Sequence, residues 1–211
     1  MTKKQNEKRM FLTSGVSYFV IFFLAIYANF FVIEAIKNAP LEVVFSQSNI
    51  VERGIAALML TVLFDVIVAC TLYTLFKPNS LTIASTLFRL IHALFLAVAT
   101  VSLVNSLSFH SEGLILDGIN RFNSIWMLGL AFFGIHLILL SMIVPAPTSI
   151  RSFLFLGGLA YFIDTILHLT FSAYSDYAFS LLLFVAIPTV VGEFSLAVWF
   201  IKQGTQSKVA Q

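Results

Sequence analysis

The chain has 211 residues, of which 59% are hydrophobic and only 10% are charged, with a formal net charge of +2. A soluble domain carries about 25% charged residues because its surface faces water, so this composition excludes a soluble globule and indicates an apolar surface that faces lipid. The small net charge indicates no nucleic-acid partner.

Six apolar segments follow one another, each long enough to cross the roughly 30 Å hydrocarbon core as a helix. The first follows a basic tail, residues 1–9, and is too long for a signal peptide, so we expect a retained anchor. Pro145 and Pro147 end the fourth, because proline cannot continue a helix. The spans are predicted at residues 10–33, 50–76, 81–108, 120–144, 150–172 and 177–201. We expect one transmembrane domain over residues 10–203 and a disordered polar tail over residues 204–211.

The distribution of lysine and arginine predicts the orientation. If the N-terminus lies in the cytoplasm, the cytoplasmic segments hold eight basic residues and the opposite side holds three. The eight are Lys3, Lys4, Lys8, Arg9, Lys77, Arg151, Lys202 and Lys208, and the three are Lys37, Arg53 and Arg121. Cytoplasmic loops carry such an excess. The predicted fold is therefore an all-α integral membrane bundle with six transmembrane helices and with N- and C-termini cytoplasmic.

The second to sixth spans each carry an ionisable residue far from their ends. Near the bilayer centre such a group costs at least ~2.5–3.5 kcal/mol, so it tends to face protein or water. At 1.5 Å per residue, five of these residues lie roughly 13–20 Å from the cytoplasmic boundary, and we expect them to converge on one interior pocket. The predicted ligand-binding or structural polar cluster is Asp65, Arg89, His92, His136, Tyr161, Asp164 and Glu193.

The charges in this cluster do not balance. Asp65, Asp164 and Glu193 face a single fixed cation, Arg89. At low dielectric, a carboxylate must then be protonated, a histidine charged, or a cation bound. Because Arg89 and Glu193 lie at nearly equal depth, they are the first choice for an ion pair, and Asp65 is the next candidate. Pro188 adds a kink shortly before Glu193.

The stretches around these residues resemble a family of bacterial membrane proteins known only as a domain of unknown function, DUF4386. They are FDVIVACTLYTLFKP around Asp65, STLFRLIHA around Arg89, LAFFGIHLILL around His136, GGLAYFIDTILHL around Asp164 and VVGEFSLAVWFIKQG around Glu193. With NIVERG at the start of the second span, the resemblance covers about residues 10–204. The resemblance implies that those five residues belong to the family's pattern and that His92 and His168 do not. It also implies a location in the bacterial inner (plasma) membrane, and it carries no function.

Three functions are compatible with the cluster. The favoured one is a small-solute or lipid binding or transport-type site, in which Asp65, Arg89 and Glu193 bind the solute and protons couple through His136. The spans show no inverted repeat, so a full transporter would require a homo-oligomer. The first alternative is a structural or partner-binding protein whose polar network only fixes helix packing.

The second alternative is an intramembrane metal-dependent hydrolase. Its candidate ligands, all weak, are His92, His136, Asp164 and His168. No H-x-x-x-H or H-E-x-x-H motif supports it, and no phosphate loop, G-x-S-x-G elbow or nucleotide fingerprint is present. The single cysteine, Cys70, excludes an internal disulfide. The sequence therefore favours a non-enzymatic role without a cofactor or a resident metal.

Overall fold

The computed structural model describes residues 2–76 and 78–206, and every element in these ranges is helical. The elements are α1 (Lys3–Ile26), a π-helical segment (Tyr27–Ile33), α2 (Glu34–Asn38), α3 (Pro40–Ser46), α4 (Ser48–Leu75), α5 (Ser80–Ser106), α6 (Glu112–Ile143), α7 (Thr148–Thr170) and α8 (Tyr174–Thr205). Helix α1, the π-helical segment and α2 form one continuous helical stretch, Lys3–Asn38. This stretch and the five helices α4 to α8 are long and apolar enough to cross a membrane. The predicted all-α fold with six spans is confirmed.

The helix ends differ from the predicted spans in places. The basic tail is part of α1 from Lys3 onward, because the Thr2 side chain accepts a hydrogen bond from the Gln5 amide and caps the helix. Helix α6 begins at Glu112, before the expected residue 120, and α3 lies in a region expected to be a loop. Helix α8 continues to Thr205. Lys77, Lys208 and residues 207–211 of the predicted disordered tail lie outside the described residues.

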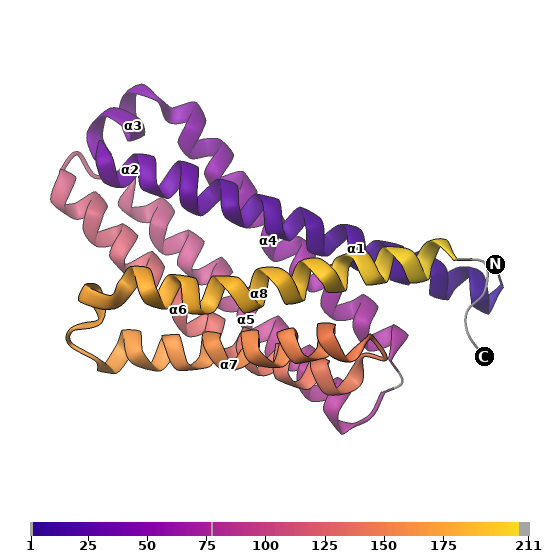
Figure 1. Cartoon of the computed structure of the whole chain (residues 1–211). Coiled ribbons are helices and arrows are strands. Elements are labelled where there is room, and N and C mark those ends of the chain that lie inside the picture. Colours follow the sequence, from indigo (N-terminus) through magenta and orange to yellow (C-terminus); the bar gives the residue numbers. More distant parts are fainter. Residues whose placement is uncertain (1, 77, 207–211) are drawn as a thin grey trace.

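The six long helices form a closed ring. Helix α1 packs on α4, α4 on α5, α5 on α6, α6 on α7, α7 on α8, and α8 returns to α1. Helix α1 begins and α8 ends at the same end of the bundle (Figure 1), which we call the terminal end. The α4–α5 and α6–α7 turns also lie there, and the opposite end is the distal end. Short connections make each helix antiparallel to the next.

Small residues allow the helices of the ring to approach closely. A Cβ added at Gly158 of α7 would lie 2.5 Å from the carbonyl oxygen of Gly134 on α6, and the reverse holds as well. On α1, a Cβ at Gly15 would lie 2.8 Å from the Ala197 carbonyl oxygen of α8. Lipid chains are as apolar as the helix surfaces, so the hydrophobic effect does not drive helices together in a membrane. Close van der Waals contacts of this kind drive their association instead.

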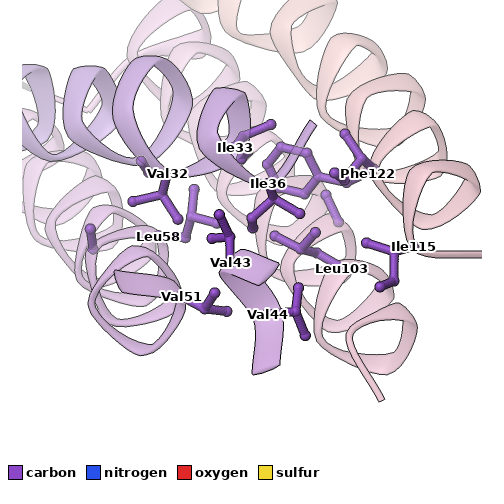
Figure 2. Close-up of a cluster of buried hydrophobic side chains, with 14 of the residues drawn as sticks. Val32, Ile33, Ile36, Val43, Val44, Val51, Leu58, Leu103, Ile115 and Phe122 are labelled. Carbon is purple, nitrogen blue, oxygen red and sulfur yellow. The ribbon is translucent and has the colours of Figure 1, made fainter. Parts of the chain in front are cut away.

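Buried apolar side chains form two clusters at different heights. The distal apolar cluster is closed by α3, whose Val43 and Val44 pack into the distal end of the ring (Figure 2). Its other labelled members are Val32, Ile33, Ile36, Val51, Leu58, Leu103, Ile115 and Phe122. The terminal apolar cluster is built on Val68, Leu72, Leu137, Leu140, Leu154, Leu196 and Phe200, among others.

A polar layer separates these two clusters. Along α4, Val62 packs against the distal cluster and Val68 belongs to the terminal one, with Asp65 between them. Along α5, the distal cluster begins only at Leu96, beyond Arg89. The fold therefore places the ionisable residues between two apolar layers that exclude water.

We predict that Gly158→Ala destabilises the bundle by about 1–3 kcal/mol, because the new methyl group collides with backbone and forces α6 and α7 apart. Gly113→Ala is the matched control, since nothing lies within 4 Å of a Cβ at that position. Thermal unfolding of both variants in detergent measures the difference. Equal unfolding temperatures would contradict this close approach of α6 and α7.

Candidate functional site

Arg89 occupies the middle of the polar layer and is 0% exposed. Its Nη2 donates a hydrogen bond to Asp65 Oδ1 of α4 over 2.6 Å. Its Nη1 donates to the Tyr18 hydroxyl of α1 over 2.8 Å and lies 3.1 Å from His136 Nε2 of α6. One side chain of α5 thus binds three other helices of the ring. We call Tyr18, Asp65, Arg89, His92 and His136 the Arg89 centre.

Two aromatic rings enclose the guanidinium group. Its Cζ lies 4.7 Å from the centroid of the Tyr18 ring and 5.3 Å from that of Phe133 on α6. A cation over an aromatic face gains about 2 kcal/mol or more when it is desolvated. The rings therefore offset part of the loss of hydration and keep water away from Arg89.

The contacts of His136 define its tautomer. Arginine only donates hydrogen bonds, so His136 Nε2 must accept from Arg89 and carries no proton. The proton then resides on Nδ1, which lies 2.9 Å from the Ser85 carbonyl oxygen and 2.8 Å from the Ser85 hydroxyl. His136 is therefore a neutral imidazole that links α6 to α5 and orients Arg89.

The ion pair at the centre leaves two buried polar atoms without a hydrogen-bond partner among the described residues. They are Asp65 Oδ2 and Arg89 Nε. The nearest base to the carboxylate oxygen is His92, whose Nε2 lies 3.6 Å away, too far for a strong hydrogen bond. The other ring nitrogen of His92, Nδ1, is also buried without a hydrogen-bond partner among the described residues, and it lies close to Gly129 of α6. The centre is therefore paired but not saturated.

Glu193 lies on the inward face of α8, at the edge of the Arg89 centre. It is half-buried, and its carboxylate is within electrostatic range of Arg89, Asp65 and Tyr18. It has no hydrogen bond or ion pair with any described residue. The expected first choice of an Arg89–Glu193 pair is thus wrong, and the second choice, Asp65, is the partner. Counting residues along a span estimates the depth of a side chain but does not show which helices are adjacent. Here α4 packs beside α5, whereas α8 packs on α1 and α7.

Tyr161 of α7 also borders the centre. Its ring meets Phe133 edge to face at 5.7 Å, and its hydroxyl contacts Thr189 on α8 and is in electrostatic range of Glu193.

Asp164 belongs to a separate site near the distal end. It accepts a hydrogen bond from the Tyr174 hydroxyl at the start of α8 over 3.0 Å. The ring of His168 meets that of Tyr174 edge to face at 4.8 Å. The one pocket expected from the sequence is therefore divided in two, because Tyr174 offers Asp164 a partner at the α7–α8 connection. We call Asp164, His168 and Tyr174 the distal polar group.

The four candidate metal ligands do not converge. His136 has both ring nitrogens engaged by Arg89 and Ser85, while Asp164 and His168 lie in the distal polar group. Among the described residues, no three or more His, Cys, Asp or Glu side chains are arranged to hold a metal ion. The hydrolase alternative therefore has no ligand set in this arrangement.

A small cavity of about 10 Å³ adjoins the centre on its terminal side. Its polar wall consists of His136 together with the hydroxyl-bearing Thr82, Ser85 and Thr86. This volume is close to the minimum that holds one water molecule. The cavity is thus of the right size and polarity for a single water beside His136.

The sequence reasoning missed the contribution of the first span. That span contains no charge over its membrane-crossing part, yet Tyr18 completes the Arg89 centre, and Ser14 one turn earlier donates a hydrogen bond to Thr71 of α4 over 2.8 Å. Ser14 and Tyr18 are four residues apart and share a helix face. This short polar stripe was the available signal.

The ring of six apolar helices around a buried ion pair defines a polytopic α-helical membrane protein with an intramembrane polar centre. The chain belongs to the DUF4386 family, a domain of unknown function, whose sequence model matches residues 13–204. An uncharacterized protein of Archaeoglobus fulgidus is 31% identical over 157 residues, covering 72% of this chain and 83% of that protein. The likeness therefore extends to an archaeal protein. No solved structure matches the chain.

We predict that Asp65→Ala lowers the free energy of unfolding by about 3–5 kcal/mol, because it leaves the Arg89 charge buried without its ion-pair partner. The double variant Asp65→Leu with Arg89→Met should be closer to wild type, since it removes both charges. Asp117→Asn breaks the exposed Asp117–Arg121 pair and should change stability by less than about 1 kcal/mol. Denaturant unfolding in detergent micelles measures the free energy of unfolding of all three variants. A double variant that is less stable than Asp65→Ala would contradict the Asp65–Arg89 pairing.

We also predict that the two polar sites are energetically independent. Asp164 and Asp65 share no hydrogen-bond partner, so the effects of Asp164→Asn and Asp65→Asn should add within about 0.5 kcal/mol. Asp164→Asn and Tyr174→Phe share one hydrogen bond and should not be additive. Double-mutant cycles test this, and strong coupling between Asp164 and Asp65 would indicate a single pocket after all.

Proposed function

We propose that the protein is a binding or transport-type membrane protein whose Arg89 centre, with Glu193, takes up a small monovalent cation, the proton included. The observation that carries this proposal is the unsaturated ion pair, in which Asp65 Oδ2 and Arg89 Nε are buried without a hydrogen-bond partner in the described part of the chain. More than about 90% of buried polar groups are hydrogen-bonded, so such exceptions mark places with a role beyond packing. A cation beside Asp65 would bind the carboxylate oxygen that the protein leaves open.

The charges support a cation rather than an anion. Arg89 supplies one fixed positive charge, whereas Asp65 and Glu193 supply two carboxylates near it. His136 adds no charge, because its Nε2 accepts the hydrogen bond from Arg89. At low dielectric the second carboxylate requires a compensating positive charge. A proton or a small cation bound at Asp65 or Glu193 provides it.

The space around the centre supports a small occupant that arrives from the terminal end. The adjoining cavity of about 10 Å³ is too small for an organic solute, and its hydroxyl groups lie on the terminal side of His136. The distal side is filled by the distal apolar cluster and covered by α3. The buried hydroxyl groups on the distal side, those of Thr61 and Thr100, are bonded to carbonyl groups of their own helices, whereas the terminal side offers a cavity with a polar wall. Water and protons are therefore better accommodated on the terminal side.

The charge bias of the sequence supports a terminal end that faces the cytoplasm, with the protein in the plasma membrane, which in a bacterium is the inner membrane. In that orientation the proposed cation enters from the cytoplasm.

A structural role is the second candidate. It is favoured by the number of helices that Arg89 joins, since its contacts run from α5 to α1, α4 and α6. In this case the centre locks the ring, and neither pH nor small cations alter it beyond general salt effects.

Glu193→Gln separates the two candidates, because Glu193 has no hydrogen bond with any described residue and its amide isostere leaves the Arg89 contacts in place. We expect small cations or protons to stabilise the wild-type protein, by about 2.7 kcal/mol at a hundredfold excess over Kd, and expect Glu193→Gln to lose most of this effect. Thermal unfolding in lithium, sodium, potassium and choline chloride at constant ionic strength, across a range of pH, measures it.

Glu112→Gln is the control, since it neutralises an exposed carboxylate outside the centre and should respond as wild type does. If wild type and Glu193→Gln differ by the same amount in every salt and at every pH, the centre is a structural lock and the cation-binding proposal fails.

A further inference from the structure

The α6–α7 turn at the terminal end fixes the orientation of one arginine. Helix α6 ends at Ile143, and Pro145 has no N–H to donate to the carbonyl of Ser141, four residues earlier. Arg151 supplies the missing donor, and its Nε lies 2.7 Å from the Ser141 oxygen. The Nη1 and Nη2 groups of Arg151 have no partner among the described residues. The guanidinium group is therefore anchored at its base while its two outer amino groups stay available.

Arg151 lines an open groove of about 440 Å³ between α6 and α7. Thr148 and Ser152 supply hydroxyl groups at the same level of α7, and Phe155 and Leu156 follow about one helical turn deeper. Met142 of α6 provides the facing apolar wall and is 54% exposed. The groove thus changes from polar and basic at the terminal end to apolar toward the membrane interior.

We propose that this groove binds an anionic glycerophospholipid of the adjoining leaflet, with its phosphate on Arg151 and an acyl chain along Met142, Phe155 and Leu156. Charge complementarity supports this occupant, because no Asp or Glu lines the groove and the first turn of α7 contains no acidic residue. The planar guanidinium fork matches two oxygens of a phosphate. The volume lies within the range of about 300–1,000 Å³ that is typical of small-molecule sites.

The order of groups along the groove favours a lipid over a free phosphate ester. A soluble phosphate would use the basic end alone, whereas the exposed side chains of Phe155 and Leu156 continue the site into the hydrocarbon region. With the terminal end in the cytoplasm, the groove faces the leaflet where anionic lipids attract basic residues by about 1 kcal/mol each. The groove is separate from the Arg89 centre, so this proposal does not depend on the function proposed for the centre.

The test is lipid binding by the full chain in a neutral detergent. We expect phosphatidylglycerol to bind with a higher affinity than phosphatidylcholine, as read by native mass spectrometry and by a rise in thermal stability. Arg151→Gln should weaken phosphatidylglycerol binding about tenfold or more, because it removes a charge-assisted bidentate contact. Arg121→Gln is the matched control, since Arg121 is an exposed arginine at the other end of α6, paired with Asp117, and should leave binding unchanged.

Ser152→Asp is a second variant that leaves the Arg151–Ser141 hydrogen bond intact and places a negative charge in the groove, so it should weaken phosphatidylglycerol binding even if Arg151→Gln fails to fold. Glycerol 3-phosphate is the remaining arm. Stabilisation by glycerol 3-phosphate equal to that by the lipid would overturn the lipid assignment in favour of a free phosphate ester. Equal phosphatidylglycerol affinities for wild type and either groove variant would overturn the site itself.

Discussion

A permanent positive charge in the middle of the membrane is the constraint on which the rest of this structure depends. Arginine has no neutral form in proteins, and an unpaired buried ion costs several kcal/mol. The chain satisfies Arg89 by closing six helices into a ring, so that Asp65, Tyr18 and His136 reach it from three different helices. An open bundle would leave the guanidinium group facing lipid. Closure of the ring and pairing of Arg89 are therefore linked.

The surroundings of this centre differ between its distal and terminal sides. On the distal side, α3 places Val43 and Val44 over the end of the ring (Figure 2). The buried hydroxyl groups of Thr61 and Thr100 on this side donate hydrogen bonds to carbonyl groups of their own helices. On the terminal side, hydroxyl groups and a cavity of one-water size lie beside His136. Water penetration lowers the desolvation penalty of a buried charge. Water that approaches the centre is thus better accommodated on the terminal side than on the distal side.

The sequence alone predicted six apolar helices long enough to span a membrane, because long apolar runs are local signals. It did not predict which groups pair. Depth favoured Glu193 for Arg89, but in a ring with short connections the carboxylate on the preceding helix, Asp65, is the neighbour. Asp164 was expected at the centre because its counted depth is similar to that of Asp65. It lies instead near the distal end, where Tyr174 across the α7–α8 connection donates a hydrogen bond to it. Pairing depends on the order of helices around the ring, which height does not reveal.

Helix α8 is the element whose movement would alter the centre with the least disruption of its ion pair. It carries Glu193, which acts on Arg89 through charge alone, whereas the helices that hold Arg89 do so through hydrogen bonds. Pro188 removes one hydrogen bond from the ladder of α8 about one and a half turns before Glu193. At the next residue α8 packs closely on α7, because a Cβ added at Gly157 would lie 3.0 Å from the Thr189 side chain. Gly192 brings α8 close to α7, because an added Cβ would lie only 3.1 Å from the Leu154 amide nitrogen. This contact holds the terminal half of α8 against α7. Glu193 therefore influences the Arg89 centre by charge from a helix that packs on α1 and α7, while the Asp65–Arg89 pair joins α4 and α5 directly.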